Sequence, residues 1–177
     1  GRSLFSLGRS RESLSAFHRC TQLDPGNARH WLTFGIALNR EEDRVGAYQA
    51  LRRASELAED DAVAGEAKAL IDALLPALLH DADAAADSGA LEAAWQGFDT
   101  AAAIRPDDAA VEALRTRLLR LTREAIRALW ETRSPSVVPL CHALLGVAPD
   151  DRQVRTVLAR TLTGMRAYGD ALPEWEK

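Results

Sequence analysis

Cysteine and lysine are scarce in this chain of 177 residues, and aromatic residues make up only 6% of it. The two cysteines, Cys20 and Cys141, lie far apart and show no C-x-x-C spacing, so neither a disulfide framework nor a zinc site is indicated. Lysine occurs only at Lys68 and Lys177, and the arginines are interspersed with acidic residues. With a net charge of -4 and no basic stripe, the sequence predicts no primary role in binding nucleic acid.

Long apolar runs, proline and glycine are also in short supply. No stretch approaches the roughly 18 consecutive apolar residues that a membrane span needs. Seven prolines and eleven glycines are too few for a disordered or collagenous chain, and no alternating run of Val, Ile or Thr indicates a sheet. The 47% of hydrophobic residues are mostly Ala and Leu, which are strong helix formers. The composition therefore predicts an all-α fold.

A short phrase recurs four times along the chain. An apolar residue and a spacer are followed by Pro or Glu, and then by residues rich in Asp or Asn. The phrase occupies 23–27, 57–61, 104–108 and 147–151. Proline cannot continue the helix behind it, and Asn or Asp caps the free N–H groups of the helix ahead. Each copy therefore predicts the end of one helix and the start of the next.

The same stripe of helical positions precedes each copy. A small or medium residue is followed four positions later by a second residue and seven positions later by a third, which places all three on one face of a helix. We expect this face to be buried and its first residue to let a second helix approach closely. The stripes are Ser13, Phe17 and Cys20; Ala47, Leu51 and Ala54; Ala94, Phe98 and Ala101; and Val137, Cys141 and Leu144.

These patterns resemble the tetratricopeptide repeat. Residues 8–25 read G-x4-S-x3-F-x2-C-x4-P, and residues 89–106 read G-x4-A-x3-F-x2-A-x4-P, both similar to the second half of such a repeat. Residues 31–38 read W-x2-F-G-x2-L, which is similar to its first helix. The resemblance implies a right-handed α-solenoid of antiparallel helix pairs. Its repeats would span approximately 1–27, 28–61, 62–108, 109–151 and 152–177.

The spacing departs from the family pattern after the first step. Successive phrases are 34, 47 and 43 residues apart, and only the first value equals the family period. The extra residues fall in the first helices of the third and fourth repeats, so 62–87 and 109–131 are predicted to form two elongated helices. Pro76 is expected to kink the first of these or to split it in two. Ser134 and Pro135 are expected to start the next helix, as N-cap and first helical residue.

Both ends of the chain read as cut within a repeat. The first repeat lacks most of its first helix, and the fifth stops at Lys177. Solenoids need terminal repeats with a polar outer face, so we expect a piece of a longer bacterial protein that can self-associate through its uncapped ends. No signal peptide precedes the first repeat. The cytoplasm is the favoured compartment, and the periplasm stays open.

No pattern in the sequence predicts catalysis, a cofactor or a metal site. The four histidines have no His or Cys partner at helical ligand spacing, and the acidic runs do not match a calcium-binding loop. Cys20 and Cys141 both fall on buried stripes, where cysteine behaves as a small inert hydrophobe. A phosphate-binding loop, a nucleophile elbow and H-E-x-x-H are all missing from the sequence.

The resemblance also implies where a partner would bind. The first helix of each repeat would line a concave surface that holds a peptide or a partner helix. Projecting positions away from the buried stripes gives a set of candidate contact residues. They are Arg2, Phe5, Arg29, Leu32, Ile36, Asn39, Arg40, Asp83, Asp87, Ile126, Trp130, Thr156 and Arg160. The N-terminal part of this set is basic and favours an acidic or C-terminal peptide, unless its arginines are ordinary solvated residues.

Two functions fit these expectations. The first is a scaffold or adaptor that binds a protein partner and is not itself an enzyme. The second is the recognition arm of a larger bacterial enzyme, such as a glycosyltransferase, a sulfotransferase or a polysaccharide-export system, whose catalytic domain lies outside these residues. The second function rests on analogy of fold alone.

Overall fold

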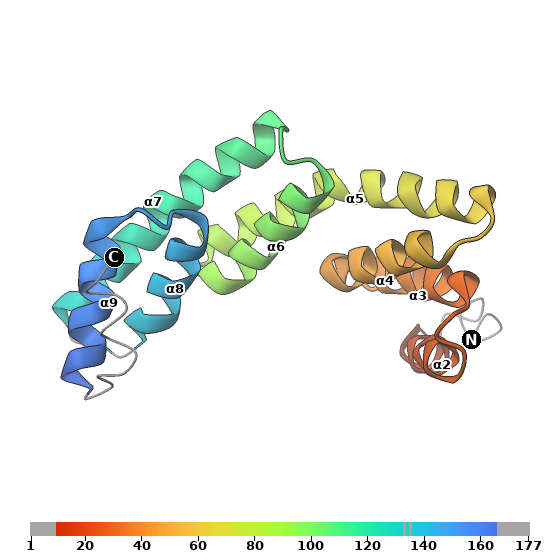
Figure 1. Ribbon diagram of the computed structural model, residues 1–177, viewed down its shortest axis with the longest axis horizontal. Helices are drawn as coiled ribbons and strands as arrows, with labels where there is room; N and C mark the ends of the chain where they lie inside the picture. The colour runs from red at the N-terminus through yellow and green to blue at the C-terminus, as the bar shows by residue number, and fades with distance from the viewer. Residues whose placement is uncertain (1–9, 133, 135, 166–177) are drawn as a thin grey trace. The chain divides into compact units, whose positions relative to one another are not determined.

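The computed structural model describes residues 10–132, 134 and 136–165. This part of the chain forms eight α-helices and no strand, which confirms the all-α prediction (Figure 1). The helices are α2 (Ser10–Leu23), α3 (Ala28–Arg40), α4 (Arg44–Leu57), α5 (Asp61–Asp87), α6 (Leu91–Ile104), α7 (Ala109–Glu131), α8 (Val137–Val147) and α9 (Arg152–Gly164). Within the described ranges, no helix combines the length and the apolar character that crossing a membrane requires.

The four recurring phrases lie at helix boundaries, as predicted. The apolar residue that opens each phrase is the last residue of a helix: Leu23 of α2, Leu57 of α4, Ile104 of α6 and Val147 of α8. The Asp or Asn side chain that follows caps the next helix by accepting a hydrogen bond from a backbone N–H. The caps are Asn27 to Arg29 at 3.1 Å, Asp60 to Ala62 at 2.9 Å, Asp108 to Ala110 at 2.8 Å and Asp151 to Val154 at 3.1 Å.

The stripes before the phrases are buried, again as predicted. Ser13, Ala47, Ala94 and Val137 are buried, and so are the second and third residues of every stripe except Cys20. Cys20 lies in the last turn of α2 and is only half-buried. The periodicity therefore predicted correctly which side of α2, α4, α6 and α8 is buried.

Backbone contacts divide the chain into two compact units. The N-terminal unit comprises Gly1–Asp81 and Asp99–Asp107, and the C-terminal unit comprises Ala82–Phe98 and Asp108–Lys177. The boundary runs through α5 and α6, so each of these helices contributes one part to each unit.

In the N-terminal unit, α3 packs against both α2 and α4. A core cluster joins Leu32 of α3 to the stripe residues of α4 and to Leu74 and Leu78 of α5. Gly35 allows the close approach of α3 to α4, because a Cβ at this position would lie 2.7 Å from Cγ of Leu51 and 3.2 Å from the carbonyl oxygen of Ala47. Even alanine at position 35 would therefore force the two helices apart.

In the C-terminal unit, α8 packs against both α7 and α9. Ile126 of α7 belongs to a buried cluster with Cys141 and Leu144 of α8 and Leu158 of α9. A buried polar contact ties α6 to α7, since the indole Nε1 of Trp95 donates to Oγ1 of Thr122 at 2.9 Å. This bond satisfies two polar groups that would be costly to bury unpaired.

The two elongated helices form as predicted at α5 and α7, with 27 and 23 residues. Pro76 lies inside α5 and does not split it. Proline removes the hydrogen bond to the carbonyl of Asp72, one turn earlier. Both Asp72 and Pro76 are exposed, so water can hydrate that carbonyl, and the helix continues.

The predicted start of α8 is wrong. The helix begins at Val137, and Ser136 occupies the N-cap position without a side-chain cap. Ser134 remains tied to the preceding helix, because its N–H donates to the carbonyl of Leu129 at 3.0 Å. Its Oγ accepts from the N–H of Ser136 at 3.3 Å, so Ser134 stabilises the turn between α7 and α8. Pro135 lies outside the described residues.

The contact at Gly35 gives a direct test of the helix packing. We expect Gly35→Ala to lower the free energy of unfolding by about 1–3 kcal/mol, because the added methyl group overpacks the contact between α3 and α4. Gly65→Ala in α5 is the matched control, since a Cβ at Gly65 meets nothing within 4 Å. The control should raise stability by about 0.5–1 kcal/mol through helix propensity. Urea unfolding measures both values, and equal behaviour of the two variants would contradict the packing.

Candidate partner-binding surfaces

Three of the five candidate residues on α3 are exposed. Arg29, Asn39 and Arg40 are exposed, while Ile36 is half-buried and packs against the core cluster. The side chain of Arg29 is 76% exposed, and its nearest acidic partner, Asp60, is 3.8 Å away. An exposed pair at that distance contributes little stability, so the guanidinium keeps most of its capacity for an incoming carboxylate.

Two of the candidate residues are placed wrongly by the sequence projection. Leu32 is 7% exposed and Ile126 is 3% exposed, and each belongs to a core cluster. Leu32 packs with residues of α4 and α5, and Ile126 packs with residues of α8 and α9. In each case a helix further along the chain covers this flank as well, α5 for Leu32 and α9 for Ile126. Neither residue is available to a partner.

Asp83 and Asp87 are not a free acidic surface. Arg117 of α7 pairs with both carboxylates, through Nη1 to Asp83 at 2.5 Å and through Nη2 to Asp87. The hydrogen bond to Asp83 and the pairing with Asp87 raise the pKa of Arg117. The two acidic residues stand in the last turns of α5, where the helix dipole disfavours negative charge. Arg117 therefore compensates this charge from the neighbouring long helix.

The remaining candidates are scattered over the C-terminal part of the chain. Trp130 and Thr156 are half-buried, and Arg160 is exposed. The hydroxyl of Thr156 donates to the carbonyl of Arg152 at 2.8 Å, within its own helix. Arg2 and Phe5 lie outside the described residues. Peptide binding by these residues stays a prediction.

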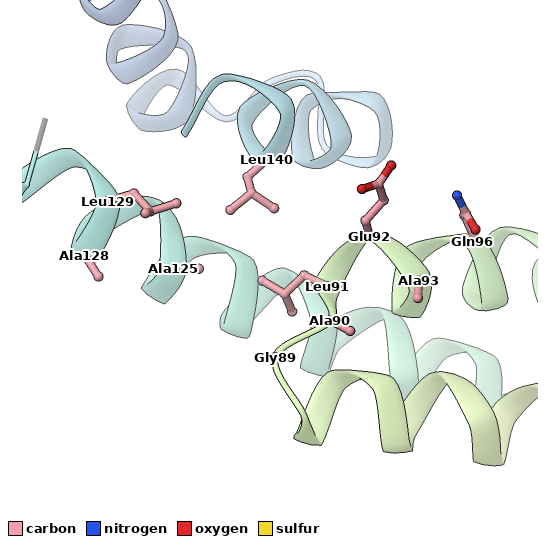
Figure 2. Close-up of a pocket in the computed structure, with 10 residues that line it drawn as sticks. All are labelled: Gly89, Ala90, Leu91, Glu92, Ala93, Gln96, Ala125, Ala128, Leu129 and Leu140. Carbon is pink, nitrogen blue, oxygen red and sulfur yellow. The ribbon is translucent and has the colours of Figure 1, made fainter. Parts of the chain in front are cut away.

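The C-terminal unit carries an open hollow that the sequence projection missed. It measures about 730 Å³ and lies between α6, α7 and α8 (Figure 2). Its lining begins with 89–93, which form the turn before α6 and the start of that helix, and with Gln96 one turn later. Helix α7 contributes Ala125, Ala128 and Leu129, and α8 contributes Leu140. Figure 2 shows Leu140 projecting from α8 toward α7. The sequence signal that could have revealed it is a set of exposed alanines, because Ala93 and Ala128 leave space where longer side chains would fill it.

A smaller hollow of about 400 Å³ lies between α3 and α4 in the N-terminal unit. Trp31, Phe34 and Leu38 line it from α3. Ala50 lines it from α4, three positions after Ala47, just as Leu140 stands three positions after Val137. Ala50 of α4 and Leu140 of α8 therefore occupy equivalent positions relative to the buried stripes of their helices. Arg52 and Arg53 also line this smaller hollow, but both pair with Glu56, at 3.5 and 3.3 Å, so its charges are compensated internally.

The described residues include no group of three or more His, Cys, Asp or Glu side chains that could hold a metal ion. Cys141 is buried in the core of the C-terminal unit, and desolvation raises the pKa of its thiol to about 11. A nucleophilic cysteine needs a lowered pKa and access to solvent, so Cys141 has the properties of a packing residue.

No protein-family model matches the chain, and no curated protein matches it. The interpretation of these surfaces therefore depends on their own geometry and chemistry.

The pairing at Arg117 predicts a salt-dependent loss of stability. We expect Arg117→Gln to melt at a lower temperature than the wild type, because two carboxylates at the end of α5 lose their counter-charge. Salt screens exposed charges, so the difference should narrow as ionic strength rises. Arg127→Gln is the control, since Arg127 is exposed on the same helix and has no ion pair with any described residue. If the melting temperature of Arg117→Gln fell by the same amount at every ionic strength, lost packing and not lost charge pairing would explain the decrease.

The burial of Cys141 predicts unequal reactivity of the two cysteines. At pH 8 a thiol with a pKa near 11 is about one part in a thousand thiolate, and the thiolate is the reactive form. Iodoacetamide should therefore modify the half-buried Cys20 and spare Cys141 in the folded protein, as read by peptide mass spectrometry. Both cysteines should react in denaturant. Alkylation of Cys141 at the rate of Cys20 would show that the core around α8 opens readily.

Proposed function

We propose that this chain is a tetratricopeptide-like helical scaffold that binds a partner protein and performs no catalysis itself. The observation that carries the proposal is the recurrence of one local design at four places. Each time a helix that carries a buried stripe ends at an apolar residue, and an Asp or Asn side chain then caps the next helix. A chain built from such units gains its core by stacking neighbours and leaves long helix faces open to partners.

The exposed face of α3 is the binding surface that we assign to this function. Its occupant is an acidic peptide, because two exposed arginines, Arg29 and Arg40, stand on this face beside the half-buried apolar side chain of Ile36. Arginine presents a planar fork that suits carboxylates. Ile36 would supply an apolar contact between the two charges.

A peptide display library, selected against the purified protein, tests this function. We expect the selected peptides to be rich in Asp and Glu and to bind saturably by fluorescence anisotropy. The double variant Arg29→Glu with Arg40→Glu should weaken that binding by about tenfold or more, since each attractive contact becomes repulsive. Thermal stability should change little, because both residues are exposed.

The matched control is Arg120→Glu with Arg127→Glu, which makes the same change of charge at two exposed positions of α7. A control that weakens binding as much as the α3 variant would indicate a non-specific effect of net charge. Failure of the library to yield any saturable binder would contradict the scaffold function itself.

A further inference from the structure

The open hollow of the C-terminal unit is the strongest feature that the assigned α3 surface leaves unexplained. Six of its ten lining residues are exposed, so it cannot enclose a small molecule as a ligand pocket does. Its size and openness instead suit a segment of another macromolecule. This inference rests on the proposal that the chain is a partner-binding scaffold, but it concerns a different face.

The lining chemistry distinguishes a helix from an extended peptide. Leu91, Leu129 and Leu140 make the hollow apolar, and Glu92 and Gln96 are the polar side chains among its described lining residues. An extended peptide brings unpaired backbone N–H and C=O groups, and the helices that line the hollow already use most of theirs. A helix satisfies its own backbone and needs only an apolar contact. Ala93 and Ala128 leave room for its backbone to come close.

Glu92 sets the charge of the occupant. Among the described residues that line the hollow it is the only charged one, and it has no ion pair with any described residue. In the same unit Asp83, Asp87 and Asp151 all pair with arginines. A carboxylate at the edge of an apolar hollow attracts a Lys or Arg that flanks the apolar face of an incoming helix.

The described helices of a second copy do not fit as the occupant. Among the described residues, Leu23 and Met165 are the large hydrophobic side chains that are exposed, and each stands alone at the end of its helix. The described helices therefore offer no apolar stripe that would fill the hollow of another copy.

We propose that the hollow between α6, α7 and α8 binds an amphipathic helix of a partner protein. The aliphatic face of that helix covers Leu129 and Leu140, and a Lys or Arg at its edge pairs with Glu92.

Two synthetic helical peptides serve as probes of this site. Both carry leucines on one face, and they differ only in having lysine or glutamate at the edge of that face. We expect the lysine peptide to bind more tightly by about two- to fivefold, the value of one partly exposed ion pair, as measured by fluorescence anisotropy. Ala128→Trp should weaken the binding of both by about tenfold or more, because the indole fills the hollow.

Ala113→Trp is the matched control, since Ala113 is an exposed alanine of the same helix that does not line the hollow. This control should bind as the wild type does. Glu92→Lys should reverse the order of the two peptides. Equal binding to the Ala128→Trp and Ala113→Trp variants, or no saturable binding of either peptide, would overturn the proposal.

Three further outcomes separate the alternatives. A third probe with a central proline cannot form a continuous helix, and equal binding of this probe would show an extended occupant and contradict the proposal. Concentration-dependent dimerisation that Ala128→Trp abolishes would identify a second copy and also overturn it. If library-selected peptides bind at the α3 face and Ala128→Trp leaves the helical probes unaffected, the scaffold function stands and the helix site is wrong.

Discussion

The backbone N–H groups in the first turns of α3, α5, α7 and α9, which have no partner within their own helix, are the constraint on which this structure depends. Asn27, Asp60, Asp108 and Asp151 satisfy these groups immediately after the previous helix has ended. The connections from α2 to α3, from α4 to α5, from α6 to α7 and from α8 to α9 are therefore three or four residues long. Such short connections hold the joined helices beside one another, and α2 packs against α3 as α8 packs against α9.

The added length of α5 and α7 creates a second requirement. These helices have 27 and 23 residues, whereas α3 has 13. A longer helix exposes more surface and ends further from the core of its own pair. Asp83 and Asp87 lie near the C-terminal end of α5, where the helix dipole disfavours negative charge. Arg117 of α7 supplies a positive charge that pairs with both carboxylates. The two elongated helices are thus tied to each other by charge as well as packed through buried residues.

Local features of the sequence were predictable because local chemistry determines them. A cap needs only its own side chain and the next turn, and a stripe follows from helical periodicity, so both were predicted at nearly every position. Leu32 and Ile126 are buried, contrary to the projection, because residues of α5 and α9, two helices further along the chain, also pack against them. Ser134 was misplaced because its N–H completes the end of α7 instead of starting α8. The hollow beside Ala128 was missed since it arises from three helices together.

The two proposed surfaces would act on a partner in different ways. Arg29 and Arg40 are exposed, so their attraction reaches through solvent and is screened by salt. Such charges mainly accelerate encounter and select a complementary partner. Leu129 and Leu140 are half-buried, and covering them removes apolar surface from water, a contribution that salt does not screen. The α3 surface would therefore mainly govern how fast an acidic segment is captured, and the hollow would mainly govern how long an amphipathic helix stays bound.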